Sequence, residues 1–336
     1  MDTQIFKPTQ DSIKSACDII KNGGVVAIPT ETVYGLFADA TKSEACANIF
    51  TAKDRPQDNP LIVHISDYDM LKRVALEIPE DAIKLAEAFW PGPLTIILKK
   101  TELIPDTTSA GLDTVGIRMP SHPVVLEIIS KTGLPLAGPS ANRSGRPSPT
   151  DAQTVYNDMT GRIPLVLDGG DCNIGVESTV VSLAGDQPVL FRPGYITKAQ
   201  MEDVLHKEVI LSKGITEELS QGEKVLSPGL KHKHYAPKAD VIIVNAEFDK
   251  YKQLVEDENA TALCFDEYAD KLNVSSVCYG SVKDSASQAV RLFQALRELD
   301  EIGAGRVYAM MPSTEDVGLA VYNRLLRAAA FRVVNL

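Results

Sequence analysis

Short apolar segments alternate with amphipathic, helix-type segments between residues 11 and 137, and this alternation constrains the fold more strongly than any other feature. The helix-type segments span residues 11–21, 43–52, 79–89 and 124–132. The strand-type segments span residues 25–28, 61–65, 94–98 and 134–137. Such alternation predicts an α/β domain, and the prolines and short spacings favour a mixed, twisted sheet over a regular doubly wound one. Ser43, followed by Glu44, is expected to cap the second helix.

A second, smaller domain is predicted beyond a linker. Residues 214–238 are rich in Gly, Ser, Pro, His and Lys and show little apolar periodicity, which is typical of a linker. Strand-type segments at 239–244, 261–265 and 305–311 then alternate with helix-type segments at 287–299 and 316–330. We therefore divide the chain into residues 1–213, 214–238 and 239–336, and we expect a Rossmann-like α/β unit in the last. It lacks Gly-x-Gly-x-x-Gly, so we assign it no dinucleotide site.

Composition excludes several classes of protein. Hydrophobic residues make up 44% of the 336 residues, which is ample for buried cores. Five cysteines without a Cys-x-x-Cys pair predict neither a disulfide framework nor a zinc site, and they fit a reducing, cytoplasmic location. No apolar run approaches the roughly 20 residues of a membrane span. The net charge of −11 predicts weak or no direct nucleic-acid binding.

The loop of residues 140–150 (SANRSGRPSPT) combines small hydroxyl side chains, an amide, two guanidiniums, glycine and prolines just after a strand-type segment. These groups are suited to holding a carboxylate or a phosphate. An ordinary polar loop uses the same residue types, so both interpretations stay open at this point.

Two further polar clusters follow strand-type or helix-type segments. Lys53 and Arg55 lie two residues apart, so in an extended segment both side chains would point at one ligand. The alternative is a solvated basic turn. Hydroxyl side chains also follow the strand-type segment at 25–28, in residues 30–34. Three polar clusters at the ends of predicted elements indicate a single site.

An ordered series of motifs resembles the YrdC-type threonylcarbamoyl-AMP synthases over the first two-thirds of the chain. The motifs are residues 30–36 (TETVYGL), 53–56 (KDRP), 90–95 (WPGPLT), 115–120 (VGIRMP), 138–142 (GPSAN) and 177–181 (ESTVV). A linker motif at 227–237 (SPGLKHKHYAP) and the segment beyond it resemble the long, two-domain form of that family. The resemblance implies a YrdC-like N-terminal fold with an open concave cleft.

The resemblance also implies an activity. L-threonine, bicarbonate and ATP would give threonylcarbamoyl-AMP and pyrophosphate, and a separate transferase complex would move the threonylcarbamoyl group to tRNA. Positions that match ATP contacts are Arg55, Asn59, Ser140, Ser148, Arg192 and Tyr235. Positions that match threonine contacts are Thr32, His64, Arg118 and Ser178, with Arg118 forming a bidentate pair with the carboxylate.

Catalysis of this kind consists mainly of holding and neutralising phosphates. The residues expected to do so are Lys53, Arg55, Ser140 and Asn142. We assign no metal-ligating residue, and we expect Mg²⁺ to be held mainly by the ATP phosphates and water. The cations Lys231, Lys233 and Lys238, together with Tyr235, suggest that the linker closes over the site as a lid.

Two rival functions remain. The same basic cleft could bind RNA, although the acidic net charge argues against this. A related carbamoyltransferase could form carbamoyl-adenylate instead, although the accessory zinc-finger cysteine pairs are missing. Neither a P-loop nor a Gly-x-Ser-x-Gly motif occurs in the chain, which disfavours P-loop enzymes and α/β-hydrolases.

Overall fold

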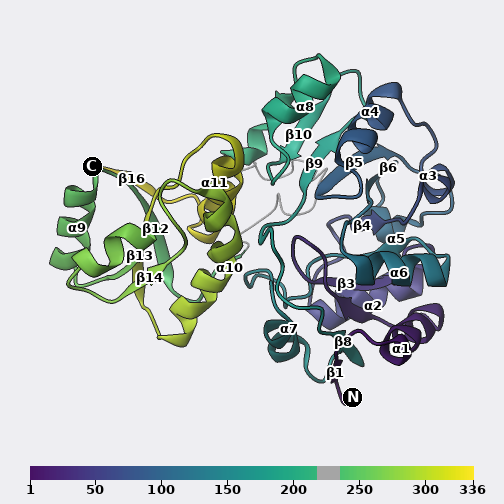
Figure 1. Cartoon of the computed structure of the whole chain (residues 1–336), viewed down its shortest axis with the longest axis horizontal. Helices are drawn as coiled ribbons and strands as arrows, with labels where there is room; N and C mark the ends of the chain where they lie inside the picture. Colours follow the sequence, from purple (N-terminus) through teal and green to yellow (C-terminus); the bar gives the residue numbers. More distant parts are fainter. Residues whose placement is uncertain (218–234) are drawn as a thin grey trace.

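The computed structural model describes residues 1–217 and 235–336, which form two lobes with a sheet each (Figure 1). We call residues 1–217 the N-terminal lobe and residues 239–336 the C-terminal lobe. An eleven-stranded sheet lies in the first and a five-stranded sheet in the second. Each sheet has its own hydrophobic core. The α/β fold class is therefore confirmed, while the exact domain boundaries stay predictions.

The sheet of the N-terminal lobe is mixed, as expected. Its strand order is β1-β8-β2-β3-β7-β4-β6-β5-β9-β10-β11. The strands are β1 (Gln4–Phe6), β2 (Val26–Ile28), β3 (Gly35–Asp39), β4 (Ile62–His64), β5 (Leu94–Lys99), β6 (Thr114–Arg118), β7 (Leu136–Ala137), β8 (Leu165–Leu167), β9 (Thr179–Ser182), β10 (Val189–Arg192) and β11 (Ile210–Leu211). β4 and β6 run parallel, whereas β7 runs antiparallel to β4, so the ends of β4 and β6 meet the start of β7. The chain that leaves β7 therefore runs beside the start of β4, where the Gly138 N–H donates to the Ile62 carbonyl at 2.9 Å.

Helices pack around this sheet. They are α1 (Gln10–Lys21), α2 (Ser43–Lys53), α3 (Tyr68–Val74), α4 (Glu80–Phe89), α5 (Asp106–Ser109), α6 (Pro123–Thr132), α7 (Ala152–Met159), α8 (Lys198–Leu205) and the 3₁₀ turn η1 (Lys213–Ile215). The expected cap at Ser43 is wrong. Lys42 is the extended residue that precedes α2, and it makes no side-chain capping bond, so Ser43 already belongs to the helix.

The C-terminal lobe is a parallel α/β unit, which confirms the expected Rossmann-like architecture. Its strands, in the order β14-β13-β15-β12-β16, are β12 (Asp240–Asn245), β13 (Thr261–Cys264), β14 (Ser276–Cys278), β15 (Arg306–Met310) and β16 (Val333–Asn335). The helices are α9 (Phe248–Asp257), η2 (Asp266–Lys271), α10 (Ser285–Glu301) and α11 (Asp316–Ala328). β14 and β16 are too short to stand out in the sequence, so we had expected only three strands.

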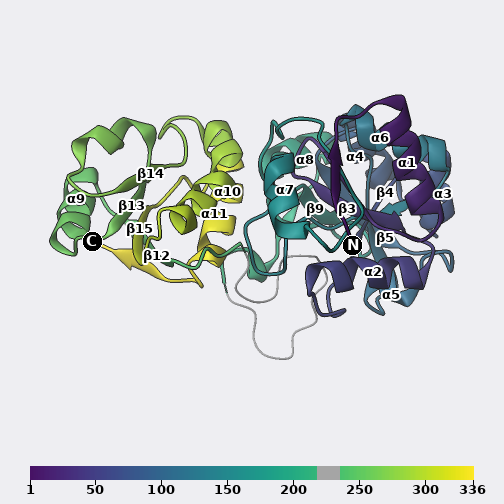
Figure 2. The same cartoon turned by 90° about the horizontal axis from the view of Figure 1, so that it is seen from below.

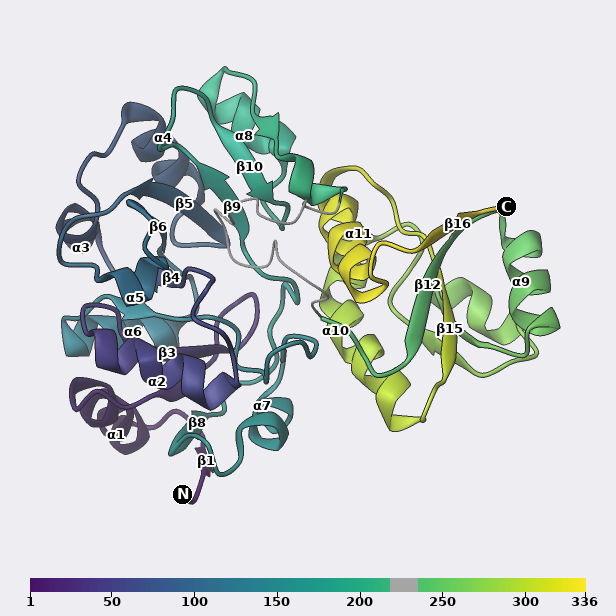
Figure 3. The ribbon, with the colours of Figure 1, turned by 180° about the vertical axis from the view of Figure 1, so that it is seen from behind.

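Helices α10 and α11 form the side of the C-terminal lobe that faces the N-terminal lobe (Figures 1 and 3), and Figure 2 shows the lobes side by side. Val33 and Val176 of the N-terminal lobe pack into the hydrophobic core of the C-terminal lobe. Gly175 has a φ of +80°, and a Cβ there would lie 2.3 Å from Cα of Val290. The backbone of α10 therefore approaches the N-terminal lobe as closely as a glycine permits.

Two expectations concern other parts of the chain. Lys231 and Lys233, on which the lid hypothesis depends, lie outside the described residues. Within residues 1–217 and 235–336, no helix combines the length and the apolar character that crossing a bilayer requires.

Candidate functional site

A cavity of about 800 Å³, including the part open to solvent, lies where the strand ends of the N-terminal lobe converge. Most of the predicted site residues line it, namely Thr32, Lys53, Arg55, His64, Arg118, Ser140, Asn142, Ser178, Arg192 and Tyr235. The remaining two, Asn59 and Ser148, are buried but do not form its wall. The structure therefore brings the three polar clusters into one site.

The aromatic ring of Phe37 shapes one side of this cavity. A Cβ on Gly35 would lie 2.4 Å from the ring, and a Cβ on Gly138 would lie 2.3 Å from it. The ring thus occupies the space that any side chain at either position would need. Its edge also meets the imidazole of His64, with the ring centroids 4.9 Å apart. Phe37 therefore fixes the spacing between the start of β3 and the polar loop after β7.

Arg118 and His64 lie side by side because they are register partners at the ends of β6 and β4. The guanidinium of Arg118 donates from Nη1 to Thr32 Oγ1 at 3.0 Å and from Nε to the Gly92 carbonyl at 3.2 Å. Its Nη2 forms a buried ion pair with Glu31 Oε1 at 2.7 Å. Burial alone would raise the pKa of Glu31, but the charge and hydrogen bond of Arg118 lower it below its ordinary value.

The imidazole of His64 is buried and uncharged at neutral pH. Burial and the adjacent charge of Arg118 lower its pKa to about 3. A His with this pKa stays unprotonated at neutral pH, so its role there is to contact a ligand rather than to carry charge. This agrees with the expectation that His64 binds substrate, which stays a prediction.

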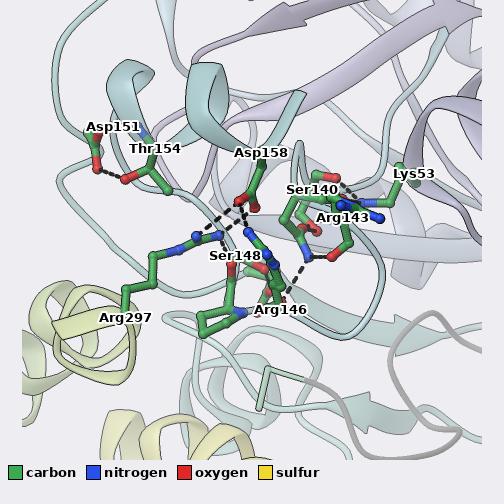
Figure 4. A network of polar contacts seen from close by, with 12 residues as sticks. Lys53, Ser140, Arg143, Arg146, Ser148, Asp151, Thr154, Asp158 and Arg297 are labelled. Carbon is green, nitrogen blue, oxygen red and sulfur yellow. Dashed lines mark hydrogen bonds and ion pairs between the residues drawn. The ribbon is translucent and has the colours of Figure 1, made fainter. Parts of the chain in front are cut away.

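The ammonium group of Lys53 is directed at the loop that follows β7. Nζ donates to the backbone carbonyl of Ser140 (Figure 4), to the carbonyl of Asn142 at 2.6 Å and to Asn142 Oδ1 at 3.4 Å. Ser140 Oγ donates to the same Oδ1 at 2.5 Å. An ammonium has three N–H groups, so loop acceptors engage all of them. Lys53 therefore holds the loop in shape from within the wall of the cavity.

The expectation that Lys53 and Arg55 converge from an extended segment is wrong. Lys53 is the last residue of α2, and Asp54 adopts a left-handed conformation with φ 52° and ψ 45°. The chain therefore turns between the two cations. Both still line the cavity, because the turn directs Lys53 toward the loop and leaves Arg55 beside the cavity.

Arg55 is the cation best placed to receive an anion. Burial lowers its pKa to about 10, so it stays charged at neutral pH. The guanidinium carbon lies 5.6 Å from the ring centroid of Phe50. The charge of the nearby Asp58 carboxylate acts on this guanidinium. Among residues 1–217 and 235–336 the guanidinium makes no hydrogen bond, so its five N–H groups are available to a ligand.

Arg192 and Tyr235 complete the opposite side of the cavity. Arg192 donates from Nε to the Ser178 carbonyl at 3.0 Å and from Nη2 to Ser178 Oγ at 3.1 Å. Burial lowers the pKa of Arg192 to about 10, so it also stays charged. The ring of Tyr235 packs against Phe293 of α10 with centroids 5.2 Å apart. This side of the cavity therefore touches the C-terminal lobe.

Glu177 is a cavity residue to which the sequence analysis assigned no role. Its Oε1 accepts a 2.5 Å hydrogen bond from Ser148, and its Oε2 accepts one from Arg324 of α11 at 3.0 Å. Ser148 thus reaches the cavity through Glu177. The sequence could have indicated Glu177, because it precedes Ser178 in the motif at residues 177–181. The sequence did not indicate a site role for Arg324, since an arginine on an amphipathic helix is usually a surface residue.

The described residues contain no group of three or more His, Cys, Asp or Glu side chains arranged to hold a metal ion. The carboxylate in the cavity wall, Glu177, is already bound to Ser148 and Arg324.

Comparisons with known proteins cover nearly the whole chain. Residues 18–194 match a family model described as "Telomere recombination", and residues 196–330 match "Threonylcarbamoyl-AMP synthase, C-terminal domain". The threonylcarbamoyl-AMP synthase of Pyrococcus abyssi is 42% identical, covering 96% of this chain and 95% of the relative. That of Bacillus subtilis is 43% identical, covering 99% and 97%. The crystal structure of P. abyssi Sua5 complexed with L-threonine matches with a TM-score of 0.92 at 38% identity, covering 100% of this chain and 99% of that one.

Proposed function

The chain belongs to the threonylcarbamoyl-AMP synthase family, and we propose that it condenses L-threonine, bicarbonate and ATP into threonylcarbamoyl-AMP and pyrophosphate. The observation that carries this proposal is one cavity whose wall contains both the guanidinium of Arg118, suited to a carboxylate, and that of Arg55, which makes no hydrogen bond within the described residues. One pocket can therefore hold an amino acid and a polyphosphate together.

The threonine side of the cavity is the group of Thr32, His64, Arg118 and Ser178. Three of the five N–H groups of Arg118 are engaged by Gly92, Thr32 and Glu31, which leaves one on each Nη nitrogen. A bidentate pair with the threonine carboxylate needs two parallel N–H groups. Thr32 and Glu31 fix the plane of the guanidinium before the substrate arrives.

The ATP side is formed by Arg55, Ser140, Arg192 and Tyr235. In the reaction, the threonine amine takes up bicarbonate with loss of water, and an oxygen of the resulting carbamate attacks the α-phosphorus of ATP. The bond to the β-phosphate oxygen breaks, and pyrophosphate carries away the electron pair. Arg55 and Arg192 supply positive charge where phosphate charge develops. Mg²⁺ enters as part of the ATP substrate, held by phosphate oxygens and water.

Lys53, Ser140 and Asn142 act as a unit in this proposal. Lys53 holds the carbonyls of Ser140 and Asn142, so the loop presents its hydroxyl and amide groups in one arrangement. Asn142 Nδ2 also donates to the Arg146 carbonyl at 2.8 Å, which closes the loop on itself. Catalytic preorganisation requires such a rigid loop.

The reaction classifies the enzyme as a nucleotidyltransferase. Its product is a mixed anhydride that a separate transferase complex would consume by moving the threonylcarbamoyl group to tRNA. A cytoplasmic site of action fits that substrate and stays a prediction.

Adenylate formation tests the proposal. The purified chain is incubated with MgATP and labelled bicarbonate, with threonine or carbamoyl phosphate added in separate reactions. Threonine-dependent pyrophosphate and threonylcarbamoyl-AMP are the expected products. Carbamoyl-adenylate formed from carbamoyl phosphate would instead support the carbamoyltransferase, and no adenylate in either reaction would favour a binding module.

A further inference from the structure

We propose that Arg324, from the C-terminal lobe, is a positioning residue for the ATP side of the cavity and acts through Glu177 on Ser148. This inference rests on the proposed function and extends it, because it gives the C-terminal lobe a part in ATP binding. The contact joins residues separated by 147 positions in the chain. Arg324 does not line the cavity, so its effect reaches the substrate only through the residues it holds.

The guanidinium of Arg324 binds two segments of the N-terminal lobe at once. Nε donates to Glu177 Oε2 at 3.0 Å, and Nη2 donates to the Glu177 backbone carbonyl at 3.1 Å. Nη1 donates to the carbonyl of Pro193. Glu177 precedes Ser178 and Pro193 follows Arg192, and Arg192 is one of the predicted ATP contacts. One side chain therefore ties together the two segments that flank the ATP side.

Glu177, held by Arg324, in turn fixes the position of the Ser148 side chain. Its second oxygen, Oε1, accepts the 2.5 Å hydrogen bond from Ser148 Oγ. Arg324 is fully buried and Glu177 is 7% exposed, so water cannot replace either partner. Burial alone would raise the pKa of Glu177, but the charges of Arg324 and Arg192 keep it below its ordinary value. Without Arg324 the carboxylate would lose a main source of its stabilisation and its fixed orientation.

A second arginine of the C-terminal lobe holds the other flank of Ser148. Arg297 of α10 donates from Nη2 to Asp158 Oδ2 at 2.8 Å and to the carbonyl of Pro147. Arg146 reaches the same Asp158 carboxylate at 2.8 Å, so Figure 4 shows both guanidiniums around one acidic group. The segment that carries Ser148 is thus fixed from α10 on one flank and from α11 on the other.

The polar contacts of Thr32 and Arg118 do not depend on Arg324. In the part of the chain that the structure describes, the hydrogen bonds and ion pairs of these two residues end on residues of the N-terminal lobe, although Val33 beside them packs against the C-terminal lobe. Loss of Arg324 should therefore weaken ATP binding more than threonine binding. A contact that only stabilised the fold would not distinguish between the two substrates.

The test measures MgATP and threonine binding separately in the full-length chain. Arg324→Gln should raise the Kd for MgATP at least roughly tenfold, the usual effect of losing a hydrogen bond to a charged group, while the threonine Kd changes less than about twofold. Ser148→Ala should weaken ATP binding when it is introduced into the wild type. In the Arg324→Gln background it should cause little further loss of ATP affinity, because both changes disrupt the same chain of contacts from Arg324 through Glu177 to Ser148.

Arg291→Gln is the matched control, because Arg291 lies on α10 and bonds within its own lobe, to Gln294, Glu298 and Cys278. It should leave both Kd values unchanged. If Arg324→Gln does not fold, the double variant Arg324→Gln/Glu177→Gln removes both buried charges and should show the same selective loss of ATP affinity.

An unchanged Kd for MgATP in whichever of these two variants folds would overturn the proposal. Equal losses for both substrates would also overturn it, because they indicate general destabilisation. Absence of ATP binding and of threonine-dependent pyrophosphate release in the wild type would instead refute the proposed function itself.

Discussion

The two sides of the cavity are held in different ways. The threonine side rests on β4 and β6, where His64 and Arg118 are register partners and Glu31 fixes the guanidinium from within the same lobe. The ATP side depends on contacts between lobes, in which Arg324 and Arg297 reach across to Glu177 and Asp158. The comparison teaches that the polar contacts of Arg118 are completed at the edge of one sheet, whereas those of Glu177 and Asp158 require the docking of a second lobe.

The largest expected effect comes from Arg55, a cavity cation that makes no hydrogen bond in the described structure. Arg55→Ala should reduce threonine-dependent pyrophosphate release by about 100-fold or more, because charge on the phosphates is no longer neutralised. Its melting temperature should change little, since the guanidinium loses only its contact with the Phe50 ring and the charge of Asp58. Arg162→Ala is a suitable control, because Arg162 pairs with Asp54 at 2.9 Å and does not line the cavity. Activity near wild type in Arg55→Ala would remove Arg55 from the ATP side.

Arg118→Lys tests whether the threonine side is independent of the ATP side. Lysine keeps the charge but cannot form a bidentate pair, so the KM for threonine should rise on the order of tenfold. The KM for ATP should stay close to the wild-type value, since the contacts of Arg118 all lie on the threonine side. Steady-state kinetics with each substrate varied in turn measures both constants. A parallel rise in both would show that the two sides are coupled.

The buried His64 predicts how acid affects the threonine side. Its folded pKa of about 3 lies below the ordinary 6.5, so at intermediate pH only the unfolded chain takes up the proton. Stability is therefore lost as pH falls from 6.5 toward 3, by about 2 kcal/mol between pH 7 and pH 5. Urea unfolding at these two pH values should show a smaller pH dependence for His64→Asn than for the wild type. His206→Asn, at the exposed end of α8, should behave like the wild type, and an unaltered pH dependence in His64→Asn would refute the assignment.

The smallest effect is the preference for threonine over serine. The cavity wall offers Phe37, Leu61 and Ile62 as apolar neighbours for a methyl group. One methyl contact gives about 1–3 kcal/mol of discrimination. Calorimetry should rank threonine above serine by roughly tenfold in Kd, with ATP affinity the same in either complex. Equal affinities would mean that no part of the threonine side fits the methyl group.

Sequence analysis predicted the positions of residues at strand ends better than the contacts between the lobes, and the physical reason is locality. His64 and Arg118 each end a strand, so their place at a common sheet edge follows from short-range patterns. The turn at Asp54 was missed because a left-handed residue at the end of α2 leaves no pattern in hydrophobicity. The pairing of Arg324 with Glu177 depends on how two lobes dock, and no local pattern of residues encodes that.

The position of Arg324 near the end of the chain has a consequence for how the protein is made. Domains generally fold as units, with the N-terminal one first during synthesis. Most of the N-terminal lobe is therefore synthesised well before α11, and at that stage Glu177 and Ser148 lack the guanidinium of Arg324. On the proposal above, the ATP side reaches its final arrangement after the last helix has left the ribosome and docked. We expect a nascent or prematurely terminated chain to lack this part of the nucleotide pocket.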